Sequence, residues 1–191
     1  RDLRARGVEP MALLSLMARL GSSKPVELVS SMDDLVAGFD IGSFGAAPTK
    51  FDAEDLFPLT RHHVQGLPFA AVKDKVLALG VPEGEAEAFW AGAKGNITVL
   101  DDLGGWWTLF RDGAEPVVDE ADRAFVAEAL ALLPARPWTT ATWGGWTAAV
   151  KEATGRKGKD LFRPLRRALT GRDAGPEMAE VMPLLRRVPG I

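Results

Sequence analysis

Apolar residues recur along the chain at intervals of three and four positions, the spacing at which side chains share one face of a helix. The clearest rows are Leu13, Leu16, Met17 and Leu20; Phe69, Val72, Val76 and Leu79; Trp143, Trp146 and Val150. Alternation of apolar and polar residues, which is typical of strands, is nowhere sustained. The pattern therefore predicts an all-α protein of about nine helices joined by short Gly- and Pro-containing turns.

Residues that begin, break and end helices set the expected boundaries. Asp52 fits the N-cap of a helix that Pro58 should kink or shorten, and a helix is expected from Pro164 to Gly171. The main domain boundary is expected near Lys50, where Gly and Pro interrupt the chain. A second, less clearly marked boundary is expected at 134–137, between two prolines.

The composition is that of a globular chain, with 47% apolar and 26% charged residues in 191. It has no run of about 20 apolar residues to span a bilayer and no apolar signal segment. It also lacks cysteine, which fits a reducing cytoplasm. We expect a cytoplasmic protein, and because the chain opens at Arg1 inside a charged stretch, we interpret it as a piece of a longer one.

Charge is segregated along the chain, although the net charge is only -3. Residues 1–24 carry five basic and two acidic side chains, residues 27–128 carry seven and nineteen, and residues 136–191 carry eleven and five. Nucleic-acid binding depends on clustered Lys and Arg rather than on the total charge. The C-terminal third is therefore the part in which an RNA contact is expected.

Little in the sequence indicates catalysis. The two histidines, His62 and His63, are adjacent and point to different helical faces, without a cluster of metal-ligand spacing around them. No nucleophile elbow, Walker loop or dinucleotide glycine fingerprint occurs. No metal site is expected. The Trp row at 143 and 146 could stack bases, but its helical spacing favours packing in the core.

One basic stretch, residues 155–171, stands out from the rest of the chain. Leu161, Leu165 and Leu169 form an apolar row on which a helix could dock, which leaves Arg163, Arg166 and Arg167 for display elsewhere. Arginine suits single-stranded RNA because its planar fork pairs with phosphate or base edges and its face stacks on bases. The alternative is a merely solvated basic surface.

The same stretch carries a family resemblance. The segment from Lys157 to Gly171 has the form K-G-K-x-L-F-x-P-L-R-x-A-L-T-G and is followed by Gly175-Pro176-Glu177. It resembles the C-terminal signature of bacterial glutamyl-tRNA synthetases. The N-terminal segment 3–21 resembles the helix that follows the lysine loop of these enzymes, and Pro48-x-Lys50-Phe51-Asp52 resembles their P-A-K-F-D segment.

The resemblance implies a helical stem-contact region over 1–60 and an anticodon-binding domain of two helical subdomains, 61–134 and 135–191. Arg166, Gly175 and Pro176 match positions that contact the anticodon in the family. Lys157, Lys159, Arg163 and Arg167 are expected phosphate contacts by charge and place, with a solvated surface as the alternative. Contacts are left open in residues 67–134, and near Thr60, where the family's usual Asn is replaced.

The implied partners are tRNA(Glu) and the family's own N-terminal Rossmann domain, without membrane or DNA. The catalytic H-I-G-H and K-M-S-K-S elements are absent, so no catalytic residue is assigned. We expect no cofactor in this part, since ATP and Mg belong to the catalytic domain of the family. A free-standing helical protein-interaction domain is the alternative function. A small autonomous enzyme is a third. Whether tRNA(Gln) is also read stays open.

Overall fold

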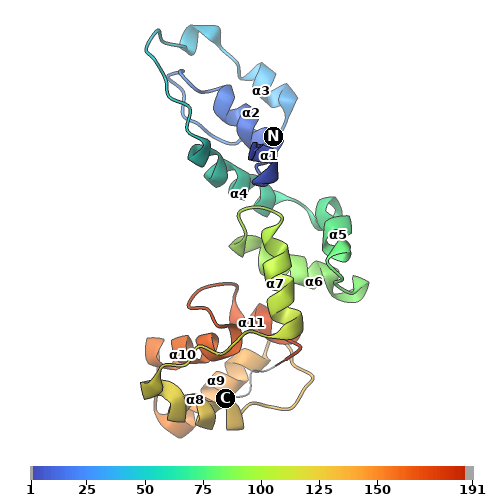
Figure 1. Ribbon diagram of the computed structural model, residues 1–191, viewed down its shortest axis with the longest axis vertical. Coiled ribbons are helices and arrows are strands. Elements are labelled where there is room, and N and C mark those ends of the chain that lie inside the picture. Colours follow the sequence, from blue (N-terminus) through green and yellow to red (C-terminus); the bar gives the residue numbers. More distant parts are fainter. Residues whose placement is uncertain (1, 188–191) are drawn as a thin grey trace. The chain divides into compact units, whose positions relative to one another are not determined.

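The computed structural model describes residues 2–187, which form helices joined by turns and extended segments (Figure 1). Within these residues there is no strand, only an isolated antiparallel bridge between Ser22 and Phe44. The predicted all-α class is confirmed. The chain divides into two compact units: residues up to 72 together with 97–103, and residues 73–96 together with 104 onward. The boundaries expected at 60 and 134 stay predictions.

The first unit is built where two helices pack side by side (Figure 1). Its core joins Ala12 and Leu16 of one helix to Leu56 and Leu59 of the other. The elements are α1 (Asp2–Ala5), α2 (Pro10–Met17), α3 (Met32–Ala37), two 3-10 turns (Ile41–Ser43 and Ala53–Asp55) and α4 (Leu56–Gly66). Thr60 is fully buried in α4, and its hydroxyl accepts a hydrogen bond from the Glu9 N–H at 3.3 Å.

Helix α4 starts later than a helix capped by Asp52 would. The Asp52 carboxylate accepts from the Glu54 N–H at 3.0 Å, but it caps the 3-10 turn Ala53–Asp55 rather than the helix itself. Because α4 begins only at Leu56, Pro58 lies in its first turn, where the missing N–H breaks no helical hydrogen bond. The helix therefore continues to Gly66, and of the two expected effects of Pro58, a kink or a shorter helix, the start at Leu56 corresponds to the second.

The second unit contains the remaining helices. α5 (Phe69–Ala78) and α7 (Asp102–Asp112) have their first residues in the first unit and the rest in this one. The others are α6 (Glu83–Ala93), α8 (Arg123–Ala131), α9 (Thr142–Thr154), α10 (Lys159–Thr170), α11 (Met178–Val181) and three 3-10 turns (Lys94–Asn96, Glu120–Asp122, Met182–Leu184).

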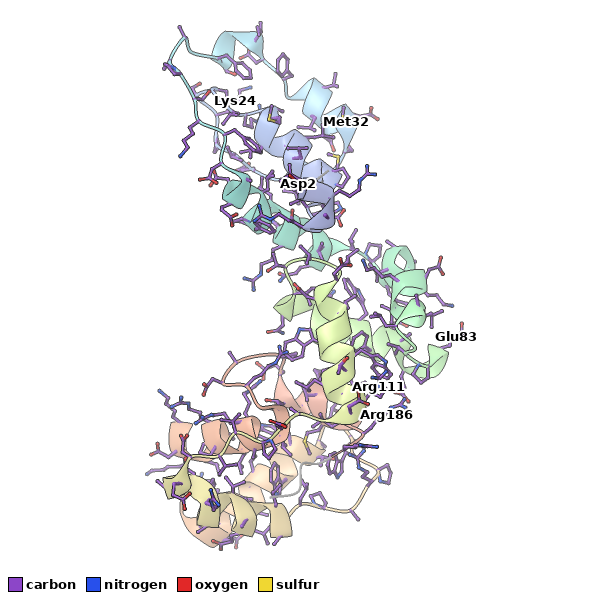
Figure 2. The ribbon with its side chains drawn as sticks, in the orientation of Figure 1. Asp2, Lys24, Met32, Glu83, Arg111 and Arg186 are labelled. Carbon is purple, nitrogen blue, oxygen red and sulfur yellow. The ribbon has the colours of Figure 1, made fainter. Side chains whose placement is uncertain are left out.

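Aromatic side chains fill much of this unit's interior. Phe89 meets Trp107 and Phe110 edge to face, with ring centroids 5.6 and 5.8 Å apart. Arg186 lies beside the end of α7 in Figure 2, where its N–H donates to the Phe110 carbonyl at 2.8 Å and its guanidinium pairs with Glu85 at 3.0 Å. Arg186, near the C-terminal end of the described chain, thus packs against this aromatic core and is held there by both bonds.

The predicted Trp row lies mainly in the core, as expected. Trp146 and Val150 are buried, and the Trp146 indole N–H donates to the Ala129 carbonyl at 2.8 Å. Trp143 is only half-buried, and its ring packs edge to face on Trp146, with centroids 5.6 Å apart. One end of the row therefore reaches the surface.

Within the described part of the chain, no helix combines the length and the apolar character that crossing a membrane requires.

Candidate nucleic-acid interface

Helix α10 docks through the apolar row that the sequence predicted. Leu161, Leu165 and Leu169 are all at most 1% exposed. The helix ends at Thr170 and is capped by Gly171, whose φ of 67° lies in the left-handed region and whose backbone closely approaches the Glu115 carbonyl. A Cβ at this position would lie 2.9 Å from that oxygen. Glycine therefore fixes both the end of α10 and its contact with the preceding segment.

α10 begins earlier than expected, at Lys159 rather than Pro164, so the predicted start was wrong. Pro164 instead lies inside the helix, where it cannot donate to the carbonyl of Asp160, four residues before it. That carbonyl accepts from Arg156 Nη1 at 3.3 Å. An arginine of the preceding loop thus replaces the donor that proline lacks, and Lys159 becomes part of the helix.

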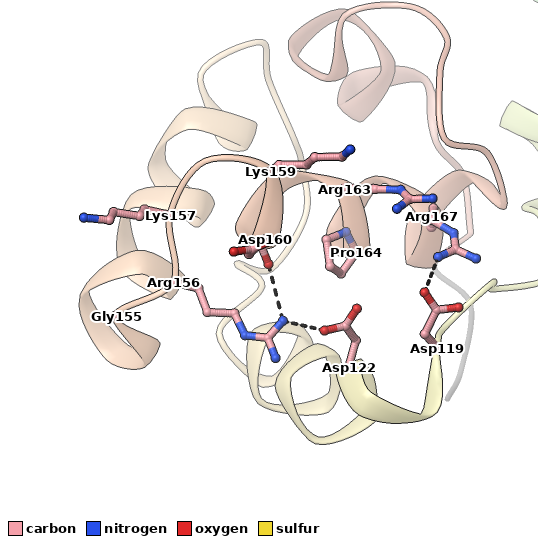
Figure 3. Close-up of a pocket in the computed structure, with 10 residues that line it drawn as sticks. All are labelled: Asp119, Asp122, Gly155, Arg156, Lys157, Lys159, Asp160, Arg163, Pro164 and Arg167. Carbon is pink, nitrogen blue, oxygen red and sulfur yellow. Dashed lines mark hydrogen bonds and ion pairs between the residues drawn. The ribbon is translucent and has the colours of Figure 1, made fainter.

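A concave pocket of about 690 Å³ lies along this helix (Figure 3). It is lined by five basic side chains, Arg156, Lys157, Lys159, Arg163 and Arg167, and three acidic ones, Asp119, Asp122 and Asp160, together with Gly155 and Pro164. All four residues that the sequence predicted as phosphate contacts therefore line one pocket. A polar concave surface with excess positive charge suits a phosphate backbone.

Two of the four predicted phosphate contacts already have acidic partners. Arg163 Nε lies 2.6 Å from Asp173 Oδ1, and Arg167 Nη1 lies 2.6 Å from Asp119 Oδ2. Hydrogen bonding to Arg163 lowers the pKa of the Asp173 carboxyl and raises that of Arg163 itself. The Arg167 side chain is only 14% exposed. The expected display of Arg167 at the surface was therefore wrong, because aspartates from two loops hold these arginines.

The two lysines behave differently. Lys157 and Lys159 are exposed, and Figure 3 shows both side chains extending away from the three carboxylates. Over residues 2–187, neither ammonium group lies in a salt bridge. Their charges are therefore available to an anionic ligand at the rim of the pocket.

The three predicted anticodon residues meet in the structure. Arg166 Nη1 donates to the Pro176 carbonyl at 2.9 Å, and a Cβ placed on Gly175 would lie 3.5 Å from the same nitrogen. Arg166 is half-buried, and burial lowers its pKa while the neighbouring Glu177 raises it. Arg166, Gly175 and Pro176 therefore form one contiguous turn-and-helix corner, which we call the Arg166 corner.

Trp106, in α7, forms the floor of the Arg166 corner. A Cβ on Gly175 would lie 2.9 Å from Trp106 Cη2, and the guanidinium of Arg172 sits 4.3 Å from the centre of the Trp106 ring. This role of Trp106 was not predicted from the sequence, because Trp106 lies 60 residues or more before its partners. A signal was nevertheless present in Gly175 itself, since a glycine often marks a position where the backbone closely approaches another group.

A second concavity of about 570 Å³ adjoins the first. It is lined by Lys159, Phe162, Arg163, Arg166 and Asp173. Phe162 and Asp173 were not singled out from the sequence. Phe162 is 44% exposed, which the apolar row of α10 could have indicated because residue 162 falls outside it. Asp173 gave no such signal, since only the fold brings it to Arg163.

The histidines and the acidic groups show no arrangement for metal chemistry. In the described ranges, no group of three or more His, Cys, Asp or Glu side chains is placed to hold a metal ion. His63 Nε2 lies 4.0 Å from Glu9 in the first unit, which is a structural pairing rather than a ligand set.

The family model "anticodon binding domain" matches residues 87–187. A glutamate-tRNA ligase of Cereibacter sphaeroides is 71% identical over 98% of the chain, and one of Paracoccus denitrificans is 64% identical over the same share. In both cases the chain spans 43% of the relative's length. A crystal structure of a glutamate tRNA ligase from Elizabethkingia meningosepticum superposes with a TM-score of 0.74 at 22% identity, covering 96% of this chain and 39% of that one.

Proposed function

The chain belongs to the anticodon-binding domain family, and from that premise we propose that it reads the anticodon of a glutamate tRNA on behalf of a glutamate-tRNA ligase. The proposed partners are that tRNA and the ligase's own Rossmann catalytic domain. The first unit, residues up to 72 with 97–103, is proposed to contact the inside of the tRNA's L. Amino-acid activation with ATP and Mg is assigned to the catalytic domain, and positioning of the tRNA to this chain.

The observation that carries the proposal is the Arg166 corner at the edge of a basic concave surface. A planar guanidinium can pair with base edges, while exposed Lys157 and Lys159 can bind the flanking phosphates. Arg166 is half-buried and anchored to the Pro176 carbonyl, so its orientation is fixed before RNA arrives. Preorganisation of this kind lowers the entropic cost of binding.

The test compares two arginines by titrating the full chain with a tRNA(Glu) transcript at several salt concentrations. We expect Arg166→Ala to weaken binding by roughly 10- to 100-fold, the range for one arginine–base contact. Arg186→Ala is the control, because Arg186 is also paired and partly exposed but lies outside both basic pockets. Equal losses from both variants would mean that only bulk charge acts. A tRNA(Gln) transcript in the same titration measures discrimination between the two tRNAs.

Exposed apolar side chains in the first unit favour a second candidate, a protein-interaction domain. Met32, Val36, Phe39 and Ile41 are between 52% and 76% exposed. Exposed apolar side chains close together in the sequence are one feature of protein-binding surfaces. Co-purification of a protein partner, together with no tRNA shift at low salt, would favour this candidate over RNA binding.

A further inference from the structure

Phe162 is the feature of the second unit that the proposed function leaves unexplained. Among the described residues of this unit, the exposed large apolar side chains are Val117, Leu132 and Phe162, and Phe162 alone is aromatic. At 44% exposure its ring keeps much of its surface in water. A single exposed apolar side chain is common in itself, so the surroundings of the ring decide whether it can bind a ligand.

The surroundings of Phe162 are basic. Arg166 follows it by four residues and Lys159 precedes it by three, so the three side chains share one face of α10. All three line the concavity of about 570 Å³, together with Arg163 and Asp173. An exposed aromatic ring between cationic side chains is the arrangement with which proteins bind single-stranded nucleic acid, because bases stack on the ring while phosphates meet the charges.

The ring is also supported from the core. Its centroid lies 6.2 Å from that of Trp143, with 38° between the planes, and Trp143 packs edge to face on the buried Trp146. The Trp146 indole is fixed by its hydrogen bond to the Ala129 carbonyl. A chain of aromatic contacts thus holds Phe162 in place from behind, so little side-chain freedom remains to be lost on binding.

We propose that Phe162 is a stacking platform for one unpaired base of the bound RNA, next to the base that Arg166 contacts. The proposal rests on the proposed function, since it takes the ligand to be the anticodon loop of a tRNA. Stacking does not depend on base identity, because every base has a π face. Phe162 therefore contributes affinity and positions the loop, and sequence discrimination is left to Arg166.

The experiment titrates the full chain and its variants with tRNA(Glu) transcripts that carry an abasic site at one anticodon-loop position at a time. With intact tRNA, Phe162→Leu is expected to weaken binding by roughly 10- to 100-fold, the range for loss of one stacked base. Phe162→Trp should stay close to wild type because it keeps a ring. The slope of log K against log salt should not change, since no phosphate contact is lost. Leu132→Ala, an exposed apolar residue outside both pockets, is the control.

One abasic position should erase the difference between wild type and Phe162→Leu, because neither can stack on a missing base. The inference is overturned if Phe162→Leu binds intact tRNA as wild type does, if Phe162→Trp loses as much as Phe162→Leu, or if the difference persists at every abasic position. Thermal melting of each variant separates misfolding from loss of contact. If wild type itself fails to bind tRNA, the proposed function falls as well, and the two failures are thereby distinguished.

Discussion

Gly175→Ala is expected to strain the Arg166 corner through a single methyl group. The added Cβ would lie 2.9 Å from Trp106 Cη2, several tenths of an ångström inside ordinary contact. Trp106 is 5% exposed, its indole N–H reaches the Asn96 carbonyl at 3.4 Å, and Arg172 covers its ring, so the ring has little room to retreat. The φ of Gly175, 155°, adds a backbone cost for any residue with a Cβ.

Overpacking costs about 1–3 kcal/mol and an unfavourable backbone conformation about 1 kcal/mol or more. We therefore expect Gly175→Ala to lower the free energy of unfolding by about 2–4 kcal/mol, measured by urea denaturation. The Pro176 carbonyl should also shift away from Arg166, so tRNA binding should weaken in the fraction that stays folded. Gly144→Ala is the matched control: it lies in α9, with nothing within 4 Å of its added Cβ. At Gly144 the change to alanine should raise the free energy of unfolding by about 0.5–1 kcal/mol.

The decisive measurement is a double-mutant cycle with Trp106→Phe, which removes the atom that the new methyl group would meet. If the clash is the cause, the double variant should be about 1–2 kcal/mol more stable than the sum of the single changes implies. Additive effects would refute the steric reasoning. They would leave the backbone conformation as the only origin of the loss.

Two further changes test the ion pairs and the aromatic core. Asp173→Asn frees Arg163 for a phosphate, so tRNA binding should tighten at low salt and the salt slope should steepen by about 0.7 in titrations. The folded pKa of Asp173 lies below its unfolded value, so its stabilising effect is present above the unfolded pKa and is lost on acidification below about pH 4. Urea denaturation of Asp173→Asn across that range should show a shallower loss of stability than wild type. Trp146→Phe removes the indole donor of the Ala129 carbonyl, which keeps only the Leu132 N–H, and leaves a space in the core. It should cost about 2 kcal/mol in the same assay, more than Trp143→Phe at the half-buried ring.

The sequence predicted the parts of the fold that depend on local periodicity. The row of Leu161, Leu165 and Leu169 is buried as expected, because helical spacing alone decides which side of α10 meets the core. The position of Pro164 was misread, and the choice between a kink and a shorter helix at Pro58 was left open, for one reason. The effect of a proline depends on how far it lies from the helix start, and that distance was not known from sequence.

Contacts between distant segments of the chain could not be predicted. Asp119 lies 48 residues from Arg167, and Trp106 lies 69 residues from Gly175, yet each pair is in contact. No periodicity links such positions, so the sequence indicated where positive charge gathers but not which carboxylates neutralise it. The contact between Arg166, Gly175 and Pro176 could be predicted only because the family resemblance had already grouped these residues.

The hydrogen bond from Arg156 to the Asp160 carbonyl should affect how the start of α10 opens. One carbonyl of the first turn of α10, that of Asp160, is bonded from outside the helix, since Pro164 has no N–H to donate to it. Arg156 also pairs with Asp122 and lies 4.0 Å from the centre of the Phe125 ring. This one side chain therefore contacts both the start of α10 and the start of α8. Amide hydrogens of residues 157–162 should therefore exchange with solvent as one cooperative opening unit, and Arg156→Lys should accelerate their exchange together while the amides after Pro164 keep their protection.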